Sequence, residues 1–156
     1  MKPEDSSEKD NAEKTKNTAE NLFPNEKWIE WEERIYVSEH RKRGGSFGDE
    51  IRAAQILMDL GSIVYLVPED KKTPGKKYDA IVDGGKMEFK NMGGGSEGTL
   101  TEHFYRSRKQ APNVFINLEK SPLSKHRVIS ILIGARETMI KSHRGFNHRS
   151  YPYFAQ

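Results

Sequence analysis

Side chains that could take part in a reaction or bind a metal gather in residues 76–92, which read KKYDAIVDGGKMEFKNM. Two short runs of alternating apolar residues flank a Gly-Gly pair, a pattern typical of a β-hairpin. Asp79 lies near the start of the first run, and Glu88 and Lys90 lie two apart on the second. Residues two apart on a strand point to the same face of the sheet. Because a sheet face normally buries apolar side chains, acids and a lysine there indicate either solvent contact or a function.

The two acids have the chemistry of a metal site. Asp79 and Glu88 are expected on paired strands of the hairpin, so their carboxylates can converge across the ladder. Carboxylates at such a separation suit Mg²⁺ (or Mn²⁺), which takes a few oxygen ligands and keeps water molecules for substrate contact. A water on the ion can attack a phosphodiester, while Lys90 orients that water or stabilises the charge growing on the phosphate. The pattern therefore predicts a metal-dependent phosphodiesterase.

A helix before the hairpin supplies a further acid. Residues 46–61, SFGDEIRAAQILMDLG, carry apolar side chains at helical spacing. Ser46 is expected to cap the first turn, and Gly61 fits the left-handed position after the last turn. Glu50 lies in the first turn, where a negative charge also interacts well with the helix dipole. Because Asp49 serves the dipole equally well, we expect a role in the site for Glu50.

The remaining pattern predicts an α/β fold with a small mixed central sheet flanked by helices. After the polar residues 1–27, a short helix or extended arm is expected up to about Tyr36. Residues 121–142 are predicted as a helix with Ser121 as N-cap, although the run 128–133 is also compatible with a strand. The other expected elements are strands at 62–68, 78–84, 86–92 and 113–119, a helix at 99–112, and a closing strand in the C-terminal tail.

The first residues differ in composition from the rest. Residues 1–27 hold 5 Lys against 7 acidic residues and almost no apolar side chain before Leu22. This composition predicts a disordered tail, followed by one domain over 28–156.

There is no cysteine, which excludes disulfides, zinc–cysteine sites and a cysteine nucleophile. No apolar run approaches the roughly 20 residues of a membrane span, and no signal-peptide core is seen at the start. We expect action in the cytoplasm, including delivery from another cell as part of a larger effector.

The C-terminal third is basic. From Thr101 onward there are 10 Lys and Arg against 3 Glu, with four of the five histidines. Such a balance is typical of a protein that binds a polyanion such as nucleic acid, and a solvated basic face is the alternative. Arg106 and Lys109 share a helix face and are expected to contact the phosphate backbone, as is His126.

The arrangement Asp79…Glu88-Phe89-Lys90 after a helix bearing an acid resembles the PD-(D/E)XK nuclease superfamily. The resemblance covers roughly residues 47–118 and is most similar to the tRNA-cleaving C-terminal toxin domains of CdiA-type contact-dependent growth-inhibition proteins. It implies a restriction-endonuclease-like core.

The resemblance also implies roles for single residues. Glu50, Asp79 and Glu88 would hold the metal, and Lys90 would be the catalytic lysine. Gln110 matches a polar residue that some branches place on the helix after the third strand. The chain departs from the motif before the first acid, where a tyrosine replaces the name-giving proline.

The resulting hypothesis is a Mg²⁺-dependent ribonuclease that acts on tRNA. Ribonucleases can instead use the 2′-hydroxyl as nucleophile without a metal, and that route stays open. The alternatives are a DNA endonuclease, a non-catalytic nucleic-acid-binding module, and a protein-binding component of a phage or secretion particle. A toxin would need an immunity protein, for which an acidic surface is expected. The sequence leaves the oligomeric state open.

Overall fold

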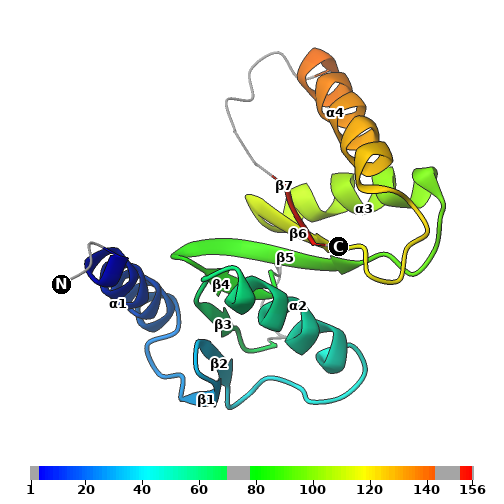
Figure 1. Cartoon of the computed structure of the whole chain (residues 1–156). Helices are drawn as coiled ribbons and strands as arrows, with labels where there is room; N and C mark the ends of the chain where they lie inside the picture. Colours follow the sequence, from blue (N-terminus) through cyan, green and yellow to red (C-terminus); the bar gives the residue numbers. More distant parts are fainter. Residues whose placement is uncertain (1–3, 70–77, 143–151, 156) are drawn as a thin grey trace. The chain divides into compact units, whose positions relative to one another are not determined.

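The computed structural model describes residues 4–69, 78–142 and 152–155 and has the expected α/β fold (Figure 1). The chain forms two compact units, and the boundary between them lies between residues 87 and 88. The first unit contains α1 (Glu4–Leu22), β1 (Trp28–Glu32), β2 (Ile35–Ser38), α2 (Phe47–Asp59), β3 (Val64–Leu66), β4 (Ala80–Val82) and the start of β5 (Gly85–Asn91). The second contains the rest of β5, then α3 (Glu97–Gln110), β6 (Asn113–Asn117), α4 (Lys125–Ser142) and β7 (Pro152–Ala155). The structure therefore divides the span 28–156, predicted as one domain, between two units.

The strands of the first unit follow one another in the order of the chain. β1 and β2 form an antiparallel hairpin, and α2 then connects β2 to the parallel strand β3. β4 and β5 continue the sheet in antiparallel fashion. The hairpin of β1 and β2 replaces the short helix or extended arm predicted before Tyr36. Its aromatic and β-branched residues alternate with glutamates in the sequence WIEWE, which suits a strand with one half-exposed face.

The predicted hairpin of β4 and β5 turns at Asp83 and Gly84, which both have positive φ, at 49° and 84°. This conformation belongs to the tight turns whose twist matches that of the flanking strands. The carboxylate of Asp83 also accepts hydrogen bonds from Ser62 Oγ at 2.8 Å and from the Ile63 backbone N–H at 3.0 Å. A third bond, 2.7 Å long, comes from Asn11 on α1. The turn is thereby fastened to α1 and to the start of β3.

Helix α2 spans the residues that its apolar spacing predicts, and Gly61 follows it with φ of 91°. The predicted role of Ser46 is wrong in detail. Its hydroxyl makes no capping bond to the backbone and donates instead to Glu50 Oε1 at 2.9 Å. The apolar face of α2 contacts β2 and β3.

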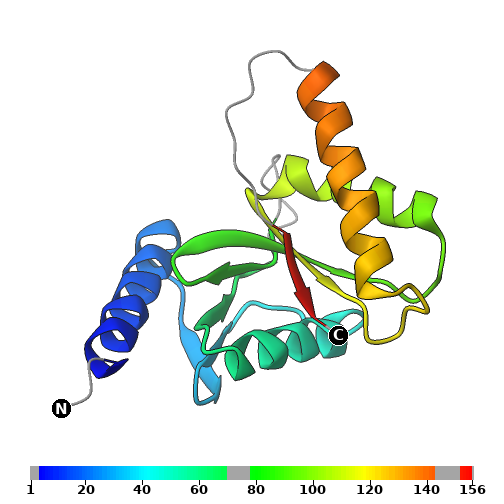
Figure 2. The ribbon, with the colours of Figure 1, turned by 45° about the horizontal axis from the view of Figure 1, so that its top comes forward.

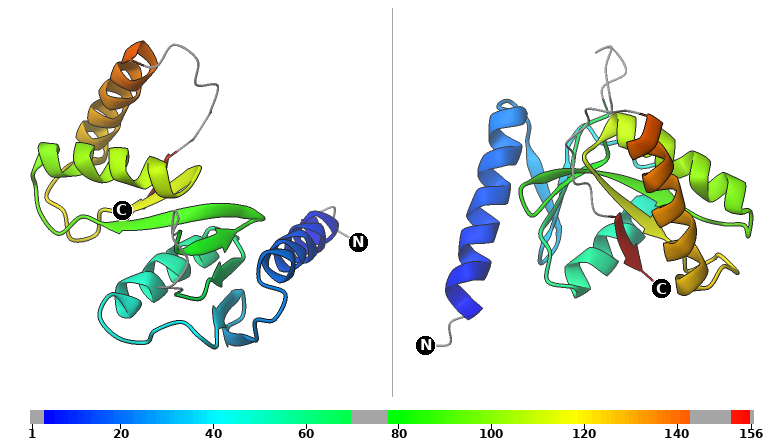
Figure 3. Two further views of the ribbon diagram at one scale, coloured as in Figure 1. Left: turned by 180° about the vertical axis from the view of Figure 1, so that it is seen from behind. Right: turned by 90° about the horizontal axis from the view of Figure 1, so that it is seen from above.

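The prediction of a disordered tail over 1–27 is wrong for residues 4–22, which form α1. Thr15 and Ala19 are fully buried, and Ala19 packs in one cluster with Ile63 and Tyr65 of the sheet. α1 and α2 cover opposite faces of these strands, as the right-hand view of Figure 3 shows. The buried face of α1 consists of small side chains, so the helix is held by close packing although its mean hydropathy is low.

In the second unit, α4 packs across α3 (Figure 2), and β7 pairs with β6 in parallel. The helix predicted at 121–142 and the closing strand of the tail are both present. α4 begins at Lys125 rather than next to Ser121, because the Oγ of Ser124 accepts the N–H of Arg127 at 3.2 Å. None of the helices in the described ranges is long and apolar enough to cross a membrane.

We predict that Ala19→Glu lowers the free energy of unfolding by about 3 kcal/mol or more, because a charge would enter a fully packed position. Urea denaturation of the whole chain measures the change. Asn17→Glu, at an exposed position of the same helix, is the control and should unfold at the wild-type midpoint. Equal midpoints for both variants would contradict the packing of α1 on the sheet.

Candidate functional site

Strand β5 carries the acid and the lysine on a face covered by α3. Phe89 points to the opposite face, where its ring packs edge-on against Phe115 at 5.8 Å between centroids. Glu88 and Lys90 share their face with Met92, two residues further on. Met92 packs in one cluster with Leu100 and Phe104 of α3. The alternation along β5 therefore turns both charged side chains towards this helix.

Glu88 and Lys90 form a close ion pair. Lys90 Nζ lies 2.7 Å from Glu88 Oε1, and the side chains are 22% and 5% exposed. A carboxylate this deeply buried needs a positive partner, because an unpaired charge in the interior costs several kcal/mol. Lys90 supplies that partner and keeps its ammonium at the edge of solvent.

His103 lies on α3, the helix that covers this face. It precedes Arg106 by three residues and Gln110 by seven, so the three side chains lie along one face of the helix. The pKa of the His103 imidazole lies below its usual value of 6.5, because burial disfavours its charged form and the positive charge of Lys90 adds to the effect. The charges of Glu102 and Arg106 act on it in opposite directions. A neutral imidazole therefore lies close enough to Lys90 to respond to its charge.

The predicted substrate-binding residues all lie on α3 and α4. Arg106 is exposed and forms an ion pair with Glu102, one turn before it. Gln110 is half-buried, while Lys109 and His126 are exposed. Arg106 and Gln110 are thus aligned with His103, and Lys109 and His126 belong to the outer surface of their helices.

In the first unit, a buried arginine joins two of the predicted metal ligands. Arg41, 3% exposed in its side chain, contacts Glu50 Oε2 through Nε at 3.1 Å and Nη2 at 2.9 Å. Nη2 also reaches Asp79 Oδ1 at 3.2 Å. Nη1 donates to the backbone carbonyl of Val67 at 2.8 Å. One guanidinium therefore gathers oxygens from α2, from the end of β3 and from the residue before β4.

The metal site predicted from Glu50, Asp79 and Glu88 does not fit the arrangement around the first two of these acids. Two carboxylates and a backbone carbonyl form an oxygen set of the kind that a hard cation takes. Arg41 already contacts one oxygen of each, and Glu50 Oε1 accepts the hydroxyl of Ser46. Over the ranges the structure describes, no cluster of three acidic or histidine side chains suits an ion. Asp79 and Glu88 belong to different units, so their convergence on one ion stays a prediction.

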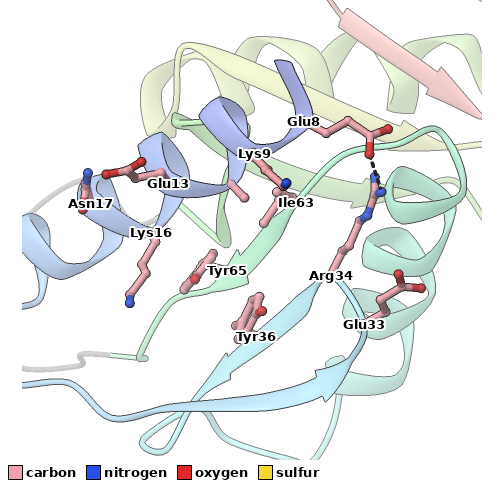
Figure 4. Close-up of a pocket in the computed structure, with 11 residues that line it drawn as sticks. Glu8, Lys9, Glu13, Lys16, Asn17, Glu33, Arg34, Tyr36, Ile63 and Tyr65 are labelled. Atoms are coloured by element: carbon pink, nitrogen blue, oxygen red, sulfur yellow. Dashed lines mark hydrogen bonds and ion pairs between the residues drawn. The ribbon is translucent and has the colours of Figure 1, made fainter. Parts of the chain in front are cut away.

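A groove of about 620 Å³ lies in the first unit between α1, β2 and β3 (Figure 4). Its floor includes the stacked rings of Tyr36 and Tyr65, whose centroids are 4.6 Å apart. Arg34 is already paired with Glu8 at 3.1 Å. Because three basic and three acidic side chains line the groove, it has no net attraction for a polyanion. These are Lys9, Lys16 and Arg34 against Glu8, Glu13 and Glu33.

Comparisons of the chain with protein-family models, with curated proteins and with solved structures find no match. The resemblance to the nuclease superfamily therefore rests on the residues of this chain alone.

Sequence reasoning missed Arg41 as a partner of the acids, and for His103 it favoured a surface or phosphate-contacting position over that of a general base. Arg41 lies in a run of basic residues, RKRGG, that looks like an exposed loop. His103 had one detectable signal, its helical spacing to Arg106 and Gln110.

We predict that Lys90→Met raises the pKa of His103 towards 6.5, because the variant removes a positive charge that disfavours the imidazolium. Titration of the imidazole by NMR measures this value. Lys109→Met is the matched control and should leave the pKa at its wild-type value. An unchanged pKa in the Lys90 variant would show that the two groups do not interact.

We predict that Arg41→Met lowers the free energy of unfolding by about 3–5 kcal/mol, since it leaves two carboxylates without their cation. Millimolar Mn²⁺ should then restore part of the loss, because the oxygen set becomes available to a metal. The control is Arg34→Met, whose exposed ion pair should cost at most about 1 kcal/mol. Thermal unfolding with and without Mn²⁺ makes the comparison. Mn²⁺ binding by the wild type that weakens on Glu50→Gln would contradict the assignment.

Proposed function

We propose that the chain is a nuclease that cleaves phosphodiester bonds in RNA, with tRNA as the first substrate to test. The observation that carries the proposal is the buried ion pair of Glu88 and Lys90 on a face covered by α3, the helix whose His103 has its pKa lowered by burial and by the charge of Lys90. A base, a cation and a carboxylate that holds the cation are the groups that phosphoryl transfer needs.

The proposed reaction uses the 2′-hydroxyl of RNA as its nucleophile. His103 accepts the hydroxyl proton while the 2′-oxygen forms a bond to the adjacent phosphorus. The bond from phosphorus to the 5′-oxygen breaks, and this oxygen leaves with a proton taken from water. Lys90 stabilises the negative charge that grows on the phosphate oxygens, and Glu88 keeps the ammonium in position. The products are a 2′,3′-cyclic phosphate and a 5′-hydroxyl.

RNA is favoured over DNA because this chemistry needs a 2′-hydroxyl. No step is assigned to a metal, since Arg41 already holds Glu50 and Asp79. Metal dependence, which the sequence pattern predicts, is therefore one arm of the experiment. As a toxin-like ribonuclease the chain would act in the cytoplasm and need an inhibitor, and its basic C-terminal helices suit an acidic one.

The test is incubation of the whole chain with total tRNA and with plasmid DNA, in Mg²⁺ and in EDTA. We expect discrete tRNA fragments with cyclic phosphate ends in both buffers. Lys90→Met and His103→Gln should each lower the rate by about 100-fold or more, the usual loss when a charge stabiliser or a base is removed. Lys16→Met, on the exposed side of α1, is the charge-matched control and should cleave normally.

The rate should also depend on pH. Because the pKa of His103 is lowered, the imidazole becomes a competent base as the pH rises through a value below 6.5, and the rate should rise there. Cleavage lost in EDTA would favour the metal-dependent route. Nicking of plasmid alone would favour a DNA endonuclease, and tight binding without cleavage a binding module.

A further inference from the structure

The arginines of α3 and α4 fall into two classes. Arg106 is paired with Glu102, and Arg127 with Glu97, which draws the carboxyl pKa of Glu97 below its usual value. In each of these exposed pairs, a glutamate of the same chain compensates the positive charge of the arginine.

Arg108 and Arg136 belong to the second class and lie near one point of contact between the helices. The hydroxyl of Tyr105 on α3 donates to the carbonyl of Ala135 on α4 at 3.3 Å. Arg108 follows Tyr105 by one helical turn, and Arg136 is the residue after Ala135. The packing of the helices therefore brings two guanidiniums to the same part of the α3–α4 surface.

The structure gives neither arginine a carboxylate partner among the residues it describes. Arg108 is half-buried and Arg136 is exposed. The pKa of the Arg108 guanidinium is lowered, first by burial and then by the positive charge of Arg136. Because arginine does not lose its proton at physiological pH, deprotonation does not relieve this repulsion. A bound anion does.

We propose that Arg108 and Arg136 form a binding site for a phosphate group of the nucleic acid. The proposal rests on the proposed function and deepens it. Guanidinium groups present planar pairs of N–H donors that match two phosphate oxygens, and two guanidiniums around one phosphate satisfy both charges. Contacts of this kind fix the position of a strand without reading its sequence. The site would hold a backbone phosphate away from the bond that is cleaved.

Fluorescence anisotropy with labelled tRNA tests the site in the Lys90→Met background, which keeps the substrate intact. We expect Arg108→Gln and Arg136→Gln each to weaken binding by about fivefold to tenfold near 100 mM salt and to reduce the salt slope by about one. Arg127→Gln is the matched control, since its guanidinium is already paired with Glu97, and should bind as the parent does. The melting temperature should stay the same or rise slightly in the Arg136 variant, because a repulsion is removed.

Further measurements distinguish nucleic acid from free phosphate as the bound anion, and they test the phosphate site separately from the nuclease activity. Inorganic phosphate and pyrophosphate are titrated as competitors, and a nucleic-acid site is supported when tRNA is bound more tightly than either. Binding that depends on Arg108 without any cleavage by the wild type would retain this site and reject the nuclease. Cleavage with tRNA binding unchanged in both variants, or binding of free phosphate alone, would overturn the site and leave the nuclease standing.

Discussion

The first unit depends on one buried guanidinium. Arg41 makes hydrogen bonds or ion pairs to a helix, to the end of one strand and to the residue before the next. The N–H of Val67 donates in turn to the carbonyl of Asp79 at 3.1 Å, so the strand ends and the arginine form one connected network. Removing a charge from water is costly, and only good geometry with nearly all donors satisfied offsets that cost. Because Glu50 and Asp79 share this cation, α2 is fixed to the adjoining ends of β3 and β4. The predicted role of these acids as metal ligands competes directly with this structural one.

Local patterns predict most of the elements, but they predict neither the β1–β2 hairpin nor α1. α2 has large apolar side chains at helical spacing, and Asp83-Gly84 has turn chemistry, so each element is encoded within a few residues. The buried side of α1 is instead made of small side chains such as Thr15 and Ala19, which leave a weak hydrophobic signal. Burial of Ala19 against Tyr65 requires a partner strand more than forty residues away. Composition alone therefore indicates disorder where the fold makes a helix.

In the candidate site, too, the sequence of a single strand predicts some features, while others depend on packing against residues far away in the chain. The alternation of β5 predicts that Glu88 and Lys90 share a face, and the structure confirms this as an ion pair. What that face meets is set by the packing of α3, since Met92 joins Leu100 and Phe104 in the core. The position of His103 on the helix that covers this face follows only from that packing. In the same way, the side chain of Arg41 looks solvated in its loop until the contacts to Glu50 and Asp79, 9 and 38 residues away, are known.

Folding alone gives little reason for an acid and a lysine on the covered face of β5. Replacing a buried ion pair with well-packed apolar residues is often neutral or stabilising, so such a pair is weak evidence of a contribution to stability. Apolar side chains occupy the neighbouring positions Met87 and Phe89, which are buried to about the same extent as Glu88. The ion pair instead holds an ammonium on the face that α3 covers, where its charge helps to lower the pKa of the His103 imidazole. The proposed function would give these three side chains a common purpose that the stability of the strand does not require.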